Sequence, residues 1–265
     1  MRFLVVILFM TSNLMAQNVL VTAHRGASGY APENTLSAVK KALDIGVDRI
    51  EIDVQQTADG VVICLHDKTL DRTTSGKGKV EEKPFSELKK LKANKGFESD
   101  FPDDPIPTLE QVFEVLDGTT HFVIEIKAGH ETYPEIEENV VALIRKFKAE
   151  KWAVVHSFND KVLEFIHTNH PDIRLQKLFV SYSGGLMLDF KLHSVKLSSY
   201  DYVEGFGISK TGTKRKLVEK IHALGKTVHV WTVNEESDMK KLIELGVDGL
   251  ISNYPEKAKR LVGSK

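Results

Sequence analysis

The sequence has little of several features that would place it in a special class. It contains one cysteine, Cys64, so no disulfide can form within the chain, and the apolar run around it predicts a buried, inert thiol. Basic and acidic residues nearly balance, at 36 and 37, and no clustered basic excess indicates nucleic-acid binding. After the N-terminal stretch no segment is apolar enough to cross a membrane. These absences leave an ordinary globular composition over 265 residues.

The first sixteen residues form a pattern of their own. Met1-Arg2 supplies a positive start, residues 3–10 are all apolar, and Ala16 places a small residue before Gln17. This is typical of a secretory signal peptide cleaved after Ala16, with an uncleaved N-terminal anchor as the alternative. We therefore expect a signal peptide over 1–16, a single domain over 17–265, and a periplasmic or secreted protein.

Strand-like and helix-like runs alternate through the rest of the chain. Apolar runs predict strands over 19–24, 48–54, 122–127, 152–157, 173–179, 202–208, 227–231 and 249–252. Helical patterns lie between them, one over 35–45 with Asn34 as its N-cap and a poorly marked one over 186–193. The alternation predicts a parallel sheet, and a chain of this length suits an eight-stranded (β/α)8 TIM barrel. An open doubly wound sheet is the alternative, but no glycine-rich nucleotide loop follows any strand.

One strand breaks the alternation. Residues 61–65 follow the second strand after the hairpin signal Asp59-Gly60, and so short a link cannot make a parallel crossover. We therefore expect an antiparallel return that brings His66 back beside Ile52. Residues 68–107 then form an insertion after strand 2, which can overhang the barrel mouth as a lid or specificity element.

Three carboxylates lie on two strands that we expect to be neighbours. Glu51 and Asp53 are two residues apart and point to the same side, and Glu125 repeats the pattern on the next parallel strand. Buried together without a partner they would be very costly, and a divalent cation removes that cost. The oxygen ligands suit one Mg²⁺ or Ca²⁺, and no cysteine or histidine cluster favours zinc. A salt bridge at the sheet rim, to Arg49 or Lys127, is the alternative.

Basic side chains stand at the same strand ends, where α/β barrels build active sites. His24 and His66 can supply one base and one acid, as phosphodiester cleavage needs, and Arg25 can hold phosphate oxygens. Lys127 can also bind phosphate. A Schiff-base role for Lys127, as in barrel aldolases, is less favoured because the nearby carboxylates hold its amine protonated.

These residues belong to motifs that together resemble the glycerophosphodiester phosphodiesterase family, whose fold is an eight-stranded α/β barrel with an insertion after the second strand. The resemblance covers essentially the whole mature chain, and each motif alone is weak while the ordered set is specific. The motifs are His24-Arg25-Gly26, Pro32-Glu33-Asn34-Thr35, Glu51-Ile52-Asp53-Val54, Thr57-Ala58-Asp59-Gly60, His66-Asp67, Leu70-Asp71-Arg72-Thr73-Thr74, Pro107-Thr108-Leu109-Glu110, Glu125-Ile126-Lys127 and Trp231-Thr232-Val233-Asn234.

The resemblance implies a role for each matching position. His24 and His66 match the acid/base residues, and Glu51, Asp53 and Glu125 match the metal ligands. Arg25 and Lys127 match phosphate contacts, and Trp231 matches an aromatic near the substrate. Glu33 and Asn34 match residues with a supporting role. One departure occurs late, where Ser252-Asn253 stands in place of the frequent Thr-Asp. We expect this exchange to lie away from the core motifs.

The implied activity is metal-dependent hydrolysis of a small-molecule glycerophosphodiester to glycerol 3-phosphate and an alcohol. A lysophospholipase-D-like phosphodiesterase of the same barrel family is the alternative, and it would be expected to carry an apolar, membrane-facing insertion. The insertion here is instead rich in Lys, Asp, Glu and Gly. A binding module that has lost its chemistry is a third possibility, which the complete set of charged motif residues disfavours. Neither the oligomeric state nor the division of acid and base between the histidines follows from the sequence.

Overall fold

Parallel strands close into a barrel, as the alternation predicted. The computed structural model describes residues 19–180 and 196–263, and within these ranges eight strands form the ring β1-β9-β8-β7-β6-β5-β4-β2. Parallel pairing of β1 with β2 closes it. The strands are β1 (Leu20–Ala23), β2 (Arg49–Gln56), β4 (His121–Ile126), β5 (Ala153–Ser157), β6 (Leu175–Phe179), β7 (Gly205–Ser209), β8 (Thr227–Trp231) and β9 (Gly249–Ser252). The predicted TIM barrel is confirmed, and the open sheet is excluded.

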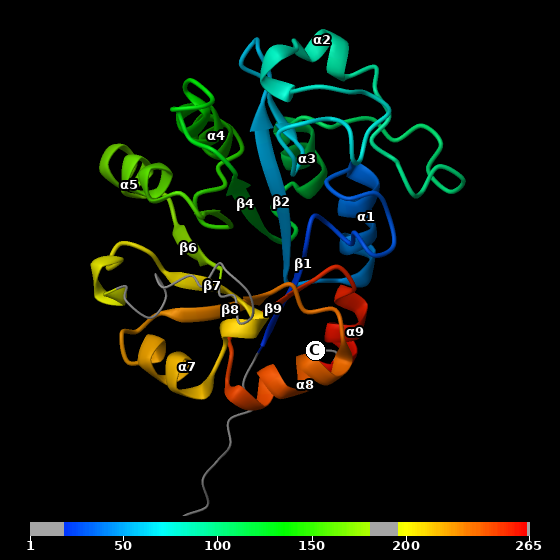
Figure 1. Cartoon of the computed structure of the whole chain (residues 1–265). Helices are drawn as coiled ribbons and strands as arrows, with labels where there is room; N and C mark the ends of the chain where they lie inside the picture. Colours follow the sequence, from blue (N-terminus) through cyan, green and yellow to red (C-terminus); the bar gives the residue numbers. More distant parts are fainter. Residues whose placement is uncertain (1–18, 181–195, 264–265) are drawn as a thin grey trace, which may run out of the picture.

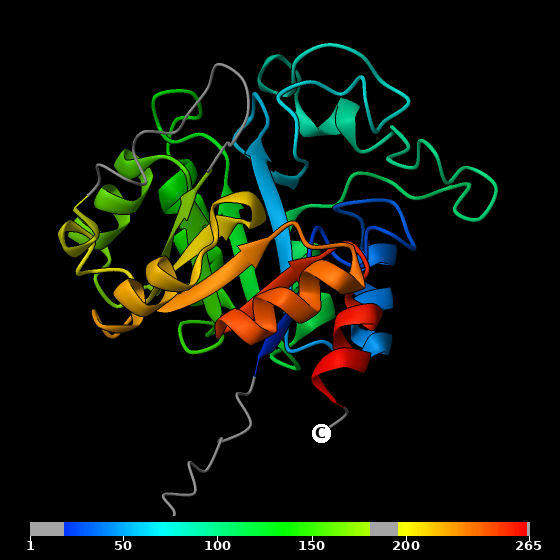
Figure 2. The same cartoon turned by 60° about the horizontal axis from the view of Figure 1, so that its bottom comes forward.

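Helices surround the barrel on its outside (Figure 1, Figure 2). They are α1 (Leu36–Ile45), α3 (Leu109–Leu116), α4 (Ile136–Lys146), α5 (Asp160–Asn169), α7 (Arg215–His222), α8 (Glu236–Leu245) and α9 (Pro255–Val262). Among the described residues none of the helices has the length and apolar character that a membrane span requires. The signal peptide expected over 1–16 and the helix expected over 186–193 lie outside the described residues.

Strand β2 separates the core from the barrel interior. Ile50, Ile52 and Val54 alternate along it, are fully buried, and belong to the hydrophobic core shared with the surrounding helices. Burying one such side chain stabilises the fold by roughly 1.5–3 kcal/mol. Because side chains alternate along a strand, Glu51 and Asp53 then face the barrel interior. Packing of the apolar side chains against the helices therefore fixes the orientation of β2, and this orientation directs the two carboxylates into the barrel.

The N-terminus of α1 differs from the expectation. Its N-cap is Thr35, whose Oγ1 accepts a hydrogen bond from the Ala38 amide at 3.3 Å. Asn34 has a φ of 60°, and its side-chain amide contacts β2. It donates to Asp53 Oδ2 at 2.9 Å and accepts from the Asp53 backbone amide at 3.0 Å. The prediction of Asn34 as N-cap is wrong. Thr35 caps the helix instead, so the Asn34 side chain is available to bind Asp53.

The hairpin after β2 is confirmed. Strand β3 (Val62–Cys64) pairs antiparallel with β2, with Val54 opposite Cys64, and Gly60 takes a φ of 82° in the turn. Following this register, the Leu65 amide donates to the Asp53 carbonyl at 3.1 Å. The next residue, His66, thus returns to the level of Ile52. Cys64 is buried, and burial raises the pKa of its thiol, so it is inert.

The insertion lies beyond the arrowhead of β2 in both views (Figure 1, Figure 2). It carries the short helices η1 (Val80–Glu82) and α2 (Phe85–Leu88). A hydrophobic cluster of its own packs it onto the hairpin, and its members are Ile63, Leu65, Leu70, Val80, Leu88, Ala93 and Ile106. The insertion is therefore anchored to the strand that delivers His66.

Candidate active site

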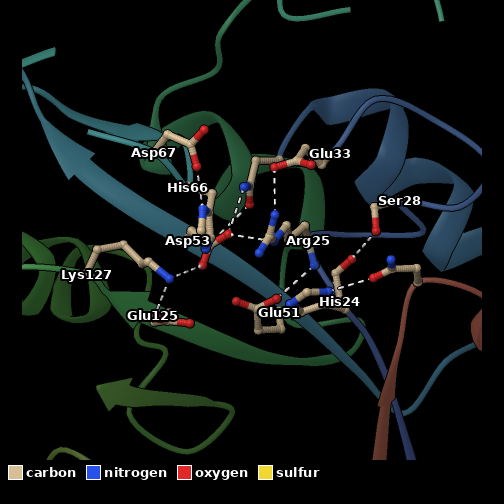
Figure 3. A network of polar contacts seen from close by, with 12 residues as sticks. His24, Arg25, Ser28, Glu33, Glu51, Asp53, His66, Asp67, Glu125 and Lys127 are labelled. Atoms are coloured by element: carbon tan, nitrogen blue, oxygen red, sulfur yellow. Dashed lines mark hydrogen bonds and ion pairs between the residues drawn. The ribbon is translucent and has the colours of Figure 1, made fainter. Parts of the chain in front are cut away.

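A cavity of about 210 Å³ opens at the C-terminal ends of the strands. Parallel strands in register bring their inward side chains to one level there, since Asp53 pairs with Glu125 and Glu125 pairs with His156 across β2, β4 and β5. The cavity is lined by His24, Arg25, Glu51, His66, Glu125, Lys127, His156, Phe158, Leu178, Trp231, Thr232 and Ile251. All seven charged or titratable residues predicted for catalysis, phosphate or metal either line it or, in the case of Asp53, adjoin it (Figure 3).

The carboxylates are buried beside two cationic side chains. Lys127 Nζ lies 2.7 Å from Glu125 Oε1 and 3.4 Å from Asp53 Oδ1, and Arg25 Nε lies 3.1 Å from Asp53 Oδ2. Burial alone would raise the pKa of Asp53, but Lys127 and Arg25 outweigh it and hold that pKa below its usual range. Burial and then the Asp53 charge raise the pKa of Glu125 to about 8, although Lys127 opposes the shift. Burial and Asp53 likewise raise the pKa of Glu51. Two cations therefore do not suffice to hold all three carboxyl groups ionised together, and two of the three carry a raised pKa.

The donor atoms fit a divalent cation. Glu51 Oε2 accepts from the Arg25 backbone amide at 2.8 Å, whereas the buried Glu51 Oε1 has no hydrogen-bond partner among the described residues. One donor atom each from Glu51, Glu125 and His156 lies within 4.8 Å of the others. Asp53 stands outside this trio, since its oxygens contact Arg25, Lys127 and Asn34. Buried carboxylate oxygens that converge without enough positive charge are suitable ligands for a hard cation.

His24 is held by a residue from the far end of the chain. Its Nδ1 lies 2.6 Å from Asn253 Oδ1, which follows β9, and an amide oxygen can only accept there. The Nδ1 proton is thereby fixed, and Nε2 keeps its lone pair. Burial lowers the pKa of His24, and Arg25 adds to this effect while Glu51 opposes it. We expected the position where asparagine replaces the frequent aspartate to lie away from the core motifs, and this is wrong. Closure of the barrel between β1 and β9 places Asn253 in contact with the motif residue His24.

His66 is held through a chain of ion pairs. Its Nδ1 donates to Asp67 Oδ1 at 2.6 Å, and Asp67 Oδ2 accepts from Arg72 Nε at 2.6 Å. Arg72 also makes two 2.8 Å bonds to Glu33, which in turn pairs with Arg25 at 2.8 Å. The hydrogen bond from Arg72 lowers the pKa of Asp67 to about 2 despite partial burial. The predicted supporting residue Glu33 thus links the loop after β1 to the insertion.

Aromatic and aliphatic side chains form the opposite wall. Trp231, at the end of β8, packs edge-on against Phe158, with ring centroids 5.4 Å apart and an interplanar angle of 83°. Leu178 and Ile251 complete this wall. Phe158 also lies 5.9 Å from Lys127 Nζ. An apolar surface facing a charged one suits an amphipathic small molecule.

Sequence reasoning missed several residues of this site, four of which are instructive. His156 stood inside an apolar strand, where a histidine is ordinarily part of the core, and Phe158 two residues later read only as loop. Asn253 and Arg72 belong to quoted segments but were given no role. The available signal was position, because His156, Phe158 and Asn253 all lie at or just past a strand end, as the predicted residues do.

A family model, curated relatives and solved structures all point to the same family of phosphodiesterases. Residues 24–257 match the model of the glycerophosphoryl diester phosphodiesterase family. A glycerophosphodiester phosphodiesterase of Caldanaerobacter subterraneus is 38% identical, covering 92% of this chain and 97% of its own, and that of Bacillus subtilis is 33% identical, covering 92% and 86%. The structure of an Oleispira antarctica phosphodiesterase in complex with the product sn-glycerol-3-phosphate superposes with a TM-score of 0.80 at 29% identity, covering 92% and 97%.

The family match spans the hairpin, the insertion and every strand end that lines the cavity. The chain therefore belongs to the glycerophosphoryl diester phosphodiesterase family.

Proposed function

We propose that the protein hydrolyses glycerophosphodiesters to glycerol 3-phosphate and a free alcohol with the help of one divalent cation, Mg²⁺ or Ca²⁺. Glycerophosphodiester phosphodiesterase activity follows from the family, and the products and metal dependence are the proposal. The observation that carries it is the convergence of two histidines, two cationic side chains and buried carboxylates on one cavity. The product bound to the Oleispira antarctica protein supports the choice of glycerol 3-phosphate.

Glu51, Asp53 and Glu125 would hold the cation. Glu51 Oε1 has no hydrogen bond among the described residues and can bind it, and Asp53 can offer Oδ1, which lies 3.4 Å from Lys127 Nζ. When bound, the cation supplies positive charge to the phosphoryl oxygens and lowers the pKa of the neighbouring glycerol hydroxyl. Lys127, now paired with Glu125 and Asp53, is then free to turn toward the phosphate.

The two histidines divide the proton transfers. His24 Nε2 takes the proton of the glycerol hydroxyl, whose oxygen bonds to phosphorus, while His66 protonates the leaving alcohol as its bond to phosphorus breaks. Water then opens the cyclic phosphate with the two roles reversed. Asn253 fixes the neutral tautomer that makes His24 a base, and the Asp67 carboxylate orients the His66 ring through its Nδ1. Arg25 and Lys127 offset charge on the phosphoryl oxygens.

A substrate panel tests this function. Glycerophosphocholine, glycerophosphoethanolamine and lysophosphatidylcholine are offered to the metal-supplied protein. Release of the free alcohol, choline or ethanolamine, is followed for all three substrates, and glycerol 3-phosphate is identified as the second product of the first two. We expect turnover of the two water-soluble diesters and little turnover of the lysolipid. Preferred cleavage of the lysolipid would instead support the lysophospholipase-D-like alternative. Borohydride trapping of a substrate on Lys127 would support the aldolase alternative.

Asn253→Ala is expected to lower kcat by about 10- to 100-fold, the usual range when the partner that orients a functional histidine is lost. The 2.6 Å contact to His24 Nδ1 motivates this prediction. Asn253→Asp keeps an acceptor oxygen and should retain most of the activity. Asn169→Ala on α5, which loses only a bond to a backbone carbonyl, serves as the control. Steady-state kinetics decide, and an unchanged kcat in Asn253→Ala contradicts the orienting role.

Arg72→Met is expected to lower kcat by about tenfold, because it releases both Asp67 and Glu33. Arg72→Lys should not restore activity, since an ammonium cannot reproduce the forked contacts. Arg145→Met is a matched control, because Arg145 makes a comparable two-pronged pair with Asp172 and is 46% exposed against 47% for Arg72. Equal kinetics in the two methionine variants would show that the chain of ion pairs does not position His66.

We further propose that the protein is exported to the periplasm or the medium. The charged start, the apolar residues 3–10 and Ala16 support this. Expression in a bacterial host should yield a mature chain that begins at Gln17, as measured by N-terminal sequencing and intact mass. A chain retaining Met1 and sedimenting with membranes contradicts cleavage and favours the anchor.

A further inference from the structure

His156 is a buried polar side chain without a partner. It lies on β5, its side chain is 3% exposed, and neither ring nitrogen has a hydrogen bond to any described residue. Leaving a buried polar group unpaired costs about 1–3 kcal/mol, so such groups are rare and call for an explanation. The proposed proton transfers do not use this histidine.

The ring points at the carboxylates. His156 Nε2 lies 3.8 Å from Glu51 Oε1 and 3.9 Å from Glu125 Oε2, which is too far for hydrogen bonds. Two donors that share one cation at about 2.0–2.2 Å each lie roughly 3–4 Å apart, so these separations match joint ligation. Glu125 and His156 are direct register partners in the parallel pair β4 and β5, so the sheet itself keeps their side chains next to each other.

The ring is in the form that binds metals. Burial lowers the pKa of His156 to about 3, and Arg49 adds to the effect, so the imidazole is neutral at physiological pH. A neutral imidazole is a common ligand of first-row metals. His229 provides a contrast within the same barrel. It is equally buried, but its ring contacts Arg49 Nη1 at 3.2 and 3.4 Å and pairs with no carboxylate in the part of the chain that the structure describes.

We propose that His156 is a nitrogen ligand of the cation held by Glu51 and Glu125, and that it shifts the preference of this site toward Mn²⁺ over Ca²⁺. The inference rests on the proposed function, because it uses the same cation site. Imidazole nitrogen suits first-row transition metals, whereas Ca²⁺ takes oxygen ligands almost exclusively. An oxygen-only set would lack this bias.

Pulsed electron paramagnetic resonance on the Mn²⁺-loaded protein tests the inference, because a ligating imidazole gives a ¹⁴N modulation. We expect this modulation in the wild type, its loss in His156→Gln, and its retention in His229→Gln. Calorimetric titration should show Mn²⁺ binding weakened by about 10- to 100-fold in His156→Gln, the scale of losing one supporting interaction at a metal site. Ca²⁺ binding should change much less than Mn²⁺ binding.

The outcomes separate the inference from the proposed function. Stoichiometric Mn²⁺ binding that Glu51→Gln abolishes, but without ¹⁴N modulation in the wild type, overturns the role of His156 and leaves the cation site standing. Equal weakening of Mn²⁺ and Ca²⁺ binding in His156→Gln overturns the proposed selectivity. Failure of the wild type to bind either metal defeats the cation part of the proposed function itself. The wild-type spectrum decides even if His156→Gln does not fold.

Discussion

His24→Ala and His66→Ala are each expected to lower kcat by roughly 10²–10⁴-fold, the usual scale for removing one general acid or base. Both imidazoles line the cavity, and each has its Nδ1 fixed by an oxygen at 2.6 Å, so Nε2 is the reacting nitrogen in both. The double variant should lose less than the product of the single losses, because residues that act as a unit are not additive.

Steady-state kinetics on folded variants decide this prediction. His222→Ala is the control, since His222 lies at the end of α7 and, among the described residues, pairs with Asp248 on the surface. Circular dichroism should show that all three variants retain the fold. Near-normal turnover by either His24→Ala or His66→Ala, on a diester with a poor leaving group, rules out the paired acid and base.

Exhaustive chelation is expected to lower activity by about 10²–10⁴-fold, which corresponds to losing several kcal/mol of charge stabilisation in the transition state. Mg²⁺ or Ca²⁺ should restore it. The basis is the group of buried carboxylates, in which burial raises the pKa of Glu51 and Glu125. A bound cation offsets the free energy needed to ionise these buried groups.

A matched pair of variants shows whether the metal acts at this site. Glu51→Gln should abolish the recovery of activity with added metal. Glu204→Gln should leave it intact, because Glu204 precedes β7 at the other end of the barrel and pairs there with Arg174. Full activity after chelation, with no metal found by elemental analysis, contradicts the prediction.

Much of the site could be predicted because strand geometry is regular. Alternation along β2 places Glu51 and Asp53 on one face, and parallel pairing then sets Glu125 beside them. Counting back from the Asp59-Gly60 turn was enough to bring His66 to the mouth, since antiparallel register is fixed by the turn. These inferences need only local pattern and topology.

The remainder depended on contacts that no local pattern encodes. Asn253 meets His24 only because the barrel closes, so its contact joins residues 229 positions apart. His156 was hidden because an imidazole within an apolar strand gives the same pattern whether it packs or ligates. Asparagine and threonine both cap helices, so the sequence alone did not separate Asn34 from Thr35. In the structure the Asn34 side chain hydrogen-bonds to Asp53, and Thr35 caps the helix. Sequence periodicity cannot rank such competing partners.

We propose that this site converts a glycerophosphodiester into glycerol 3-phosphate and a free alcohol. The most direct test is a ³¹P nuclear magnetic resonance time course of glycerophosphoethanolamine with the metal-supplied protein. We expect the diester signal to be replaced by that of glycerol 3-phosphate alone at the end of the reaction, with one equivalent of ethanolamine released. Accumulation of phosphoethanolamine, or a diester signal that persists while the folded protein has bound its cation, would contradict the account.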